Sequence, residues 1–385
     1  MRVGFDLHGL SDLMQGSRTY IANLAARLPV AAPDIDFVYY VVDPQAPAAR
    51  ALASGAPNVV LRPIPPGRFG RLVRPFPAQA AREVDVLHCQ YVGPLVGGPP
   101  TVVTVHDILH ESLPQYFPKG LGSLMRLLYP GSARRAGMVL TVSDFSRREI
   151  IARYKVPADR VAFAHLGVDA AFRPVTDAAA LAAMRGRLGI PDGPYILYVG
   201  RIEPRKNLPG LVAAYQKLRR EMGESAPVLV LAGGRDRLFA AFHEAIRRDG
   251  GGEGIVFTGS VPQEDLPALY SGAAAFAYPS FGEGFGLPVA EAMACGAPVV
   301  ASTAASVPEV AGDAALLVDP SDTEGLAAAL GRVLTDADLA AALRQKGLDR
   351  ARELTWDAAV SLAVAAYRRV GGGKDAVTPR PGIRE

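Results

Sequence analysis

The chain of 385 residues has little cysteine and no long apolar run. Its two cysteines, Cys89 and Cys295, lie far apart and show no metal-type spacing. A disulfide scaffold and a structural zinc site are therefore not expected, and we expect a reducing compartment. No segment reaches the roughly 18 to 20 consecutive apolar residues that span a bilayer. The N-terminal sequence has no signal-peptide pattern, because Asp6 interrupts its apolar run, and we expect a cytoplasmic protein.

An excess of charge of one sign is also absent. The 41 Lys and Arg residues stand against 38 Asp and Glu, which gives a formal net charge of +3. Dedicated nucleic-acid binders usually carry a strongly basic face and a domain pI above about 9, so we expect no nucleic-acid partner. The composition, 49% hydrophobic and 21% charged, excludes collagen-like, coiled-coil and disordered chains.

Short apolar runs, each followed by turn residues, recur along the whole chain. Runs of this length that are apolar throughout predict strands buried on both faces of a parallel sheet. Helical patterns separate them, which predicts an α/β protein with doubly wound sheets. The expected strands are residues 3–7, 37–42, 84–88, 101–105 and 138–142, then 195–199, 228–232, 255–258, 273–278 and 298–301.

Two of the helical patterns carry capping signals. In the pattern over residues 207–222, Asn207 is the expected N-cap. In the pattern over residues 143–154, Ser146 and Glu149 have the spacing of a capping box.

A Pro- and Gly-containing stretch between residues 173 and 194 divides the chain into halves of similar size. Residues 1–172 hold 18 basic and 13 acidic side chains, a net charge of +5, and the remainder holds 23 and 25, a net charge of −2. Basic and apolar side chains alternate over residues 117–135. This pattern fits peripheral contact with an anionic membrane, on the inner face of the cell membrane, and it equally fits a solvated surface beside an ordinary helix.

The strongest motif covers residues 278–298. It leaves a strand, passes through a glycine-rich loop and enters a helix with Pro288 near its first turn and Gly296 after its end. Backbone N–H groups at such a helix start favour an anion, typically phosphate. Glu283 in the loop and Glu291 on the helix are suited to hydroxyl groups of a ribose or a hexose. The pattern indicates a nucleotide-sugar site.

A second motif follows the expected strand 195–199. Arg201 and Lys206, with Arg205 as a third cation, would lie at the carboxyl end of this strand. Ligands bind at that edge in doubly wound sheets. Two cations there can hold a pyrophosphate and stabilise its charge as the bond to the sugar breaks. The alternative is a surface charge cluster in which Glu203 forms a salt bridge.

A third motif follows the expected strand 101–105. A neutral imidazole of His106 at the strand end can bind a substrate hydroxyl, and Asp107 can orient it or accept a proton. The alternative is a structural His–Asp contact.

Together these motifs resemble the retaining glycosyltransferases of family 4. The resemblance extends over almost the entire chain. It rests on Glu283-x7-Glu291 around Gly284-Phe285-Gly286-Leu287-Pro288, on Gly200-Arg201 before Lys206-Asn207-Leu208, and on Val142-Ser143-Asp144, Gly167-Val168-Asp169, Val307-Pro308-Glu309 and Thr355-Trp356.

The resemblance implies a GT-B fold, with two Rossmann-like doubly wound domains facing a central cleft. By that analogy residues 1–172 form an acceptor-side domain, completed by a crossover helix at about 355–370. Residues 190–354 form the donor domain, and residues 371–385 form a flexible tail.

The resemblance also implies roles for individual residues. Arg201 and Lys206 would bind the donor diphosphate, Glu291 the ribose hydroxyls and Glu283 the hydroxyls of the transferred sugar. Backbone N–H groups of Phe285, Gly286 and Leu287 would contact sugar and phosphate, and His106 would reach the sugar from the other domain.

One stretch departs from the family pattern. Members usually have a paired-glycine loop after the first strand, and here Gly16 fits one position while the second glycine is absent and Arg18 lies nearby. The geometry expected for this loop, and its contact with the donor, therefore rest on Gly16 alone.

The function favoured by this resemblance is transfer of a hexose from a nucleotide diphosphate sugar to a hydroxyl of a glycan or lipid-linked acceptor. The favoured donor is GDP-mannose. The alternatives are a UDP-sugar-dependent glucosyl- or galactosyltransferase, a nucleotide-sugar epimerase and a non-catalytic nucleotide-sugar sensor. The resemblance implies no cofactor and no metal requirement. The Asp34-Ile35-Asp36 sequence matches the Asp-x-Asp of metal-dependent transferases, but it precedes a strand, where surface carboxylates are common, so we expect no metal site there.

Overall fold

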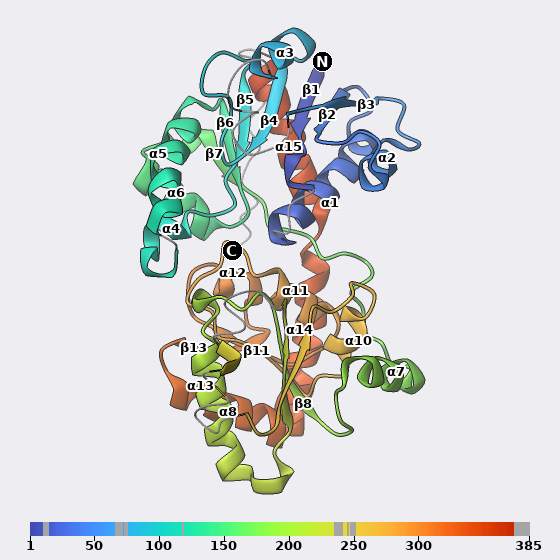
Figure 1. Ribbon diagram of the computed structural model, residues 1–385, viewed down its shortest axis with the longest axis vertical. Helices are drawn as coiled ribbons and strands as arrows, with labels where there is room; N and C mark the ends of the chain where they lie inside the picture. Colours follow the sequence, from blue (N-terminus) through green and yellow to red (C-terminus); the bar gives the residue numbers. More distant parts are fainter. Residues whose placement is uncertain are drawn as a thin grey trace. The chain divides into compact units, whose positions relative to one another are not determined.

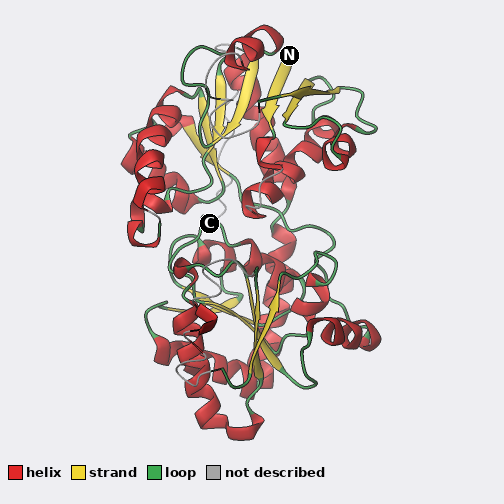
Figure 2. Cartoon of the chain, in the orientation of Figure 1, coloured by secondary structure: helices red, strands yellow, loops and turns green. Residues whose placement is uncertain are grey.

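The computed structural model describes residues 1–10, 15–65, 72, 76–117, 119–234, 242–244, 246 and 252–372. It divides into two compact units, one of Met1–Gly167 with Trp356–Glu385 and one of Val168–Thr355. Each unit is built on one sheet of parallel strands flanked by helices (Figures 1 and 2). Most of the expected flexible tail, residues 373–385, lies outside the described residues.

The sheet of the first unit has seven strands in the order β3-β2-β1-β4-β5-β6-β7. The order reverses beside β1, which makes the sheet doubly wound. Because β1 pairs with β4 and β4 with β5, the carboxyl ends of these three strands lie next to one another. The strands are β1 (Arg2–Asp6), β2 (Asp36–Val41), β3 (Val59–Pro63), β4 (Val86–Gln90), β5 (Thr101–Thr104), β6 (Met138–Thr141) and β7 (Val161–Phe163).

The last helix of the chain, α15 (Trp356–Gly371), belongs to this first unit. Its Tyr367 hydroxyl lies 2.7 Å from Nδ1 of the buried His88, and Arg368 pairs with Asp34. The other helices of the unit are α1 (Gln15–Ala31), α2 (Pro47–Ala53), α3 (Phe76–Glu83), α4 (Leu109–Ser112), α5 (Lys119–Arg135) and α6 (Asp144–Tyr154).

The sheet of the second unit has six strands in the order β10-β9-β8-β11-β12-β13, with the reversal between β8 and β11. Its strands are β8 (Tyr195–Val199), β9 (Val228–Ala232), β10 (Ile255–Gly259), β11 (Ala275–Tyr278), β12 (Val299–Ser302) and β13 (Ala315–Val318). Its helices are α7 (Ala178–Leu188), α8 (Leu208–Met222), α10 (Leu266–Ser271), α11 (Leu287–Ala294), α12 (Val307–Ala311), α13 (Thr323–Thr335) and α14 (Ala337–Glu353).

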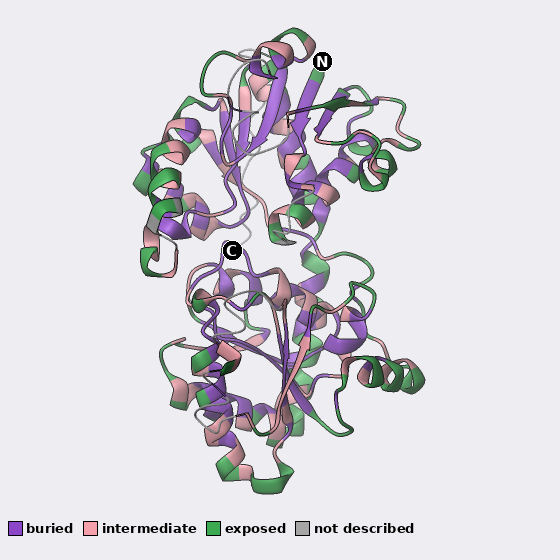
Figure 3. Ribbon diagram, viewed as in Figure 1, coloured by how far each residue is buried: buried purple, intermediate pink, exposed green. Residues whose placement is uncertain are grey.

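The ten expected strands are all present and shifted by at most two residues at either end. The α/β class with two doubly wound, Rossmann-like sheets is therefore confirmed. Three strands were missed, β3, β7 and β13, and each lies at the edge of its sheet. Most residues of these three strands are partly buried or exposed, unlike those of the central strands (Figure 3), and β7 is only three residues long.

The observed division between the units lies at Gly167 and Val168, before the break expected at residues 173–194. The segment that follows Asp177, inside the expected break, forms α7 of the second unit. Asp177 caps it by accepting from the N–H of Ala179, and Gly189 ends it with a φ of +67°.

One expected cap was assigned incorrectly. The N-cap of α6 is Ser143, whose side chain accepts from the N–H of Ser146, so Ser146 and Glu149 do not form the capping box. Glu149 instead accepts from Ser112. Asn207 is the N-cap residue of α8, as expected, but its side chain makes no capping hydrogen bond, and its amide donates to the carbonyl of Pro320.

Candidate functional site

Two loops at one edge of the second sheet carry the two strongest motifs. Strands β8 and β11 are parallel neighbours, so the loops that follow Val199 and Tyr278 begin side by side. A short helical turn, Pro204–Lys206, lies in the first loop, and the glycine-rich segment lies in the second. The structure thus brings Arg201, Lys206 and Glu283 to the same edge.

Arg205 joins these two loops. Its carbonyl accepts the N–H of Phe281 at 2.9 Å and the hydroxyl of Ser280 at 3.2 Å, and its guanidinium donates to the carbonyl of Gly282. The guanidinium also lies 3.0 Å from Oε2 of Glu283. Arg205 therefore fixes one loop against the other through both its backbone and its side chain.

Glu283 is the centre of a buried ion cluster. Its Oε1 accepts from Nζ of Lys206 at 2.8 Å and from the hydroxyl of Ser280 at 2.5 Å, and its Oε2 pairs with Arg205. Burial by itself would raise the pKa of Glu283, but the charges of Arg205 and Lys206 outweigh it and hold the pKa at about 2. These partners keep the carboxylate ionised and fix its position.

Lys206 is buried between Glu283 and an aromatic side chain. Its Nζ donates to the hydroxyl of Tyr278 at 2.7 Å and lies 5.1 Å from the centre of that ring. Burial lowers the pKa of Lys206, and the positive charge of Arg205 acts in the same direction, while Glu283 opposes both. The ammonium group is thus held at one point, with its stem shielded from water.

Arg201 is placed differently. Its side chain is 48% exposed and pairs with Glu203 at 3.2 Å, and Glu203 also lies 3.4 Å from Arg205. The Glu203 salt bridge of the alternative interpretation therefore exists. It leaves half of the Arg201 surface open to a ligand.

The glycine-rich segment positions backbone groups at the start of α11. Gly286 has a φ of +110°, which L side chains rarely adopt, and its carbonyl accepts the N–H of Val289. The hydroxyl of Ser306 donates to the carbonyls of Glu283 and Phe285 at 2.8 and 2.9 Å. In a trans peptide the next N–H points opposite to the carbonyl, so the N–H of Gly286 points away from Ser306. This orientation suits the predicted role of Gly286.

Glu291, on α11, has surroundings unlike those of Glu283. Its Oε2 accepts from the hydroxyl of Tyr270 at 2.9 Å. Burial raises the pKa of Glu291 to about 7, and the negative charge of Asp169 adds to the effect, while the Tyr270 bond opposes it. The two predicted glutamates thus have different partners and opposite pKa shifts.

In the first unit, His106 lies just beyond β5 and is 7% exposed. Burial lowers the pKa of His106 to about 4, so its imidazole is neutral at neutral pH, as expected. Its Nε2 lies 3.0 Å from Oε1 of Gln90, a residue that the sequence analysis missed. Asp107 accepts the N–H of Leu109, which stabilises the turn into α4.

Gly16, also in the first unit, does not lie in a loop as expected. It is the second residue of α1, and a Cβ atom added there would meet nothing within 4 Å. Residues 11–14, the rest of the expected glycine loop, lie outside the described residues. A side chain would therefore fit at this position of the helix, and no close approach among the described residues calls for a glycine there.

The Asp34–Asp36 pair shows no sign of binding a metal. Asp34 is exposed and both of its oxygens accept from Arg368 at 3.1 Å, and Asp36 begins β2. Across the described ranges, no group of three or more His, Cys, Asp or Glu side chains is arranged to hold a metal ion.

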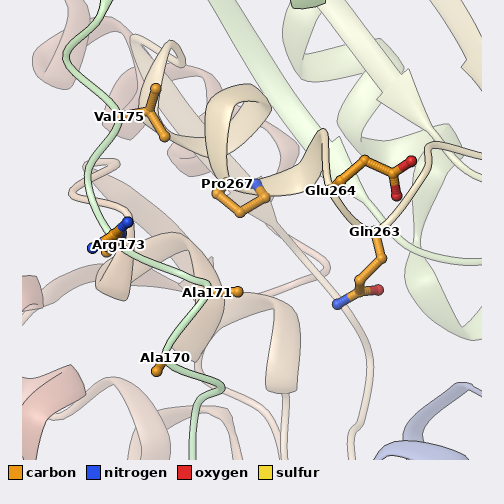
Figure 4. A pocket seen from close by; sticks show the side chains of 7 residues that line it. All are labelled: Ala170, Ala171, Arg173, Val175, Gln263, Glu264 and Pro267. Carbon is orange, nitrogen blue, oxygen red and sulfur yellow. The ribbon is translucent and has the colours of Figure 1, made fainter. Parts of the chain in front are cut away.

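An open pocket of about 630 Å³ in the second unit lies apart from the predicted residues (Figure 4). Its lining includes Arg173 from the segment before α7 and Gln263, Glu264 and Pro267 at the start of α10. None of the predicted site residues lines it, so it is not the candidate site.

Comparisons with known proteins identify the family. The model for "Glycosyltransferase Family 4" matches residues 14–172, and the model for "Glycosyl transferases group 1" matches residues 182–350. O-antigen chain mannosyltransferase B of Escherichia coli is 40% identical over 69% of this chain and 70% of its own. The chain is a family 4-like glycosyltransferase.

Other relatives place this glycosyltransferase within a broad group. D-inositol 3-phosphate glycosyltransferase of Salinispora arenicola is 29% identical over 91% of the chain and 86% of its own length. Serotype-specific mannosyltransferase WbdA of Escherichia coli is 30% identical, and the match spans 61% of this chain and 29% of WbdA.

Solved structures show the same GT-B fold. Sucrose-phosphate synthase of Thermosynechococcus elongatus aligns with a TM-score of 0.75 at 23% identity, over 97% of this chain and 100% of its own. HepE of Anabaena, solved with UDP and glucose, aligns with a TM-score of 0.72 at 20% identity, over 95% and 98%. Among the described residues of this glycosyltransferase, no helix is both long and apolar enough to cross a membrane.

The ion cluster predicts an acid-dependent loss of stability. Because the pKa of Glu283 is depressed, its carboxylate stabilises the fold fully above its ordinary pKa of 4.5, and this contribution is lost as the pH falls towards about 2. We expect Glu283→Gln to unfold at a lower temperature than the wild type near neutral pH. The difference between the two unfolding temperatures, the gap, should narrow steadily as the pH falls from about 5 to about 3.

Thermal unfolding followed by circular dichroism over this pH range measures the gap. Glu264→Gln, which removes an exposed carboxylate from the same unit, is the matched control. A gap for Glu283→Gln that is independent of pH, or no gap near neutral pH, would show that the charge of Glu283 does not stabilise the fold.

Proposed function

We propose that this glycosyltransferase transfers a mannosyl residue from GDP-mannose to a hydroxyl of a glycan or lipid-linked acceptor, with retention of anomeric configuration and without a metal ion. The observation that carries the proposal is the 40% identity to an O-antigen chain mannosyltransferase over 70% of that protein. The geometry of the second unit supports it, because a buried cation, a half-exposed cation and a helix start lie at one sheet edge.

In this proposal the donor diphosphate binds to Lys206 and Arg201. Negative charge develops on the diphosphate as the bond to the sugar breaks, and preorganised cations stabilise that charge without reorganising. Lys206 is fixed by Glu283 and Tyr278, so its position does not depend on the ligand. The backbone N–H groups of Phe285, Gly286 and Leu287 add donors that suit phosphate and sugar oxygens.

Hydroxyl groups are assigned to the carboxylates and to the imidazole. The carboxylate of Glu283 accepts from a hydroxyl of the transferred sugar, and Glu291 accepts from the ribose. His106 of the first unit, neutral and buried, serves as a further ligand for a sugar hydroxyl. A retaining reaction of this kind places the acceptor hydroxyl on the face that the diphosphate leaves.

Turnover of GDP-mannose and UDP-glucose, each offered with methyl α-mannoside in the presence of EDTA, tests the proposal. We expect GDP release and an α-linked product by NMR from GDP-mannose. Lys206→Ala should lower turnover by about 100-fold or more, on the scale of losing one charge-stabilising donor. Lys217→Ala, which removes a surface lysine of α8, is the control and should leave turnover unchanged.

Three results would contradict parts of this proposal. Turnover of UDP-glucose alone would reassign the donor. A β-linked product would exclude retention, and a strict requirement for a divalent ion would exclude metal independence.

The raised pKa of Glu291 predicts a pH-dependent affinity for nucleotide. A carboxylate accepts from two ribose hydroxyls, whereas a protonated carboxyl loses an acceptor position. We expect affinity for GDP to rise as the pH passes upward through about 7, by up to about tenfold per pH unit. Calorimetric titration of GDP into the wild type and into Glu291→Gln at several pH values measures this affinity. The variant is the reference, since it retains only the pH dependence that comes from the phosphates of GDP. Identical pH dependence in both proteins would remove Glu291 from the ribose site.

Helix α5 supports a proposed contact with an anionic membrane surface. Leu127 on this helix is 74% exposed, and the exposed Leu124 and Arg134, three residues before and seven after it, lie on the same helix face, so apolar and basic side chains share one surface. We expect the protein to sediment with phosphatidylglycerol vesicles and not with phosphatidylcholine vesicles, and Leu127→Gln to weaken sedimentation. Val30→Gln, at an exposed apolar residue of α1, is the control. Equal sedimentation of both variants would exclude α5 as the contact.

A further inference from the structure

Gln90 and His106 form a buried pair in the first unit. Gln90 ends β4 and is 2% exposed, and His106 follows the neighbouring strand β5. Oε1 of Gln90 lies 3.0 Å from Nε2 of His106. An amide oxygen can only accept, so in this arrangement Nε2 of His106 carries the proton.

The other end of the Gln90 amide, its Nε2, is buried and has no hydrogen-bond partner among the residues that the structure describes. More than about 90% of buried polar groups in proteins are paired, so an orphan donor of this kind calls for an explanation. The structure places the amide oxygen, and not this nitrogen, against the imidazole.

The imidazole is confined by two aromatic rings. Tyr20 of α1 meets it edge-on, with ring centres 4.9 Å apart, and the ring of Tyr91 lies 5.3 Å away. The hydroxyl of Tyr20 is itself held 3.1 Å from Oγ1 of Thr104. The ring of His106 is therefore held in place, and its tautomer depends on which atom Gln90 presents.

We infer that Gln90 is a positioning residue that holds His106 in the Nε2–H tautomer. Nδ1 then keeps its lone pair and accepts a hydrogen bond from a sugar hydroxyl. This inference rests on the proposed contact of His106 with the sugar. Rotating the Gln90 amide by half a turn would place its N–H group against Nε2 of His106. Nε2 would then be unprotonated and Nδ1 would carry the proton, so the imidazole would offer the substrate a donor instead of an acceptor.

Nitrogen NMR of protein labelled with ¹⁵N-histidine tests the tautomer without substrate. The signal of His106 is identified by its loss in His106→Asn. We expect a protonated Nε2 and a bare Nδ1 in the wild type, and a mixture of both tautomers in Gln90→Met. A protonated Nδ1 in the wild type, or an unchanged tautomer in Gln90→Met, would overturn the inference.

A double-mutant cycle separates this inference from the proposed function. Release of GDP from GDP-mannose, with methyl α-mannoside as acceptor, is measured for Gln90→Met, His106→Ala and the double variant. Gln90→Met should lower kcat by about 10- to 100-fold, on the scale of a misplaced acid–base group, with little change in KM for GDP-mannose. In the His106→Ala background it should have no further effect.

The outcomes of the cycle are distinct. An unimpaired His106→Ala enzyme means that the proposed role of His106 fails, while the NMR result still decides the role of Gln90. An impaired His106→Ala enzyme with an additive effect of Gln90→Met overturns the inference. Thermal unfolding of each variant shows whether the chain still folds.

Gln90→Glu gives a conservative rescue. Its carboxylate accepts from the same Nε2–H, so at about pH 8 it should restore most of the kcat that Gln90→Met loses. It should also raise the pKa of His106, so that turnover falls on acidification where the wild type stays flat. The other ionisable groups around the ring are Tyr20, Tyr91, His88 and Asp107, which both enzymes share. Failure of rescue, or a flat profile, would assign Gln90 to packing alone.

Discussion

A buried carboxylate between two cations holds the loops of the candidate site together. Glu283 comes from the loop after β11, and Lys206 and Arg205 come from the loop after β8. Taking three charges out of water costs several kcal/mol for each ion, and only close pairing offsets that cost. Removing one partner of such a pair typically costs about 3–5 kcal/mol, because the other charge stays buried. The ion pairs between the two loops thus fix the position of each loop relative to the other.

The same arrangement separates the chemistry of the two glutamates. Glu283 is surrounded by cations and stays ionised, whereas Glu291 faces a tyrosine hydroxyl in a buried setting and titrates near neutrality. Eight positions along the chain separate a carboxyl group whose pKa two cations lower from one whose pKa burial raises. One short segment therefore offers a permanent carboxylate and a titrating one, which suit ligand groups of different basicity.

The sequence predicted the parts of this structure that repeat a simple physical pattern. Central strands are apolar on both faces, and the Glu283, Lys206 and Arg201 motifs follow strands directly, so their edge of the sheet could be expected. Among the missed strands, β3 includes a charged residue and β7 has only three residues, so neither shows the pattern of a buried strand. The cap at Ser143 was missed because several hydroxyls compete there. The role of Gln90 could not be predicted, because it depends on the pairing of β4 with β5, which brings His106 beside this polar strand-end residue. The role of Arg205 as a bridge likewise depends on contacts about 77 residues away in the chain.

The first unit is discontinuous in sequence, because the whole second unit is inserted between Gly167 and Trp356. Helix α15 packs into the first unit through the contact of Tyr367 with His88, and it is synthesised after the whole second unit. During translation the second unit therefore has its complete sequence before the first one does. Domains usually complete folding from the N-terminus onward, and here the order is reversed. The first unit can be completed only when α15 has left the ribosome, some 190 residues after Gly167.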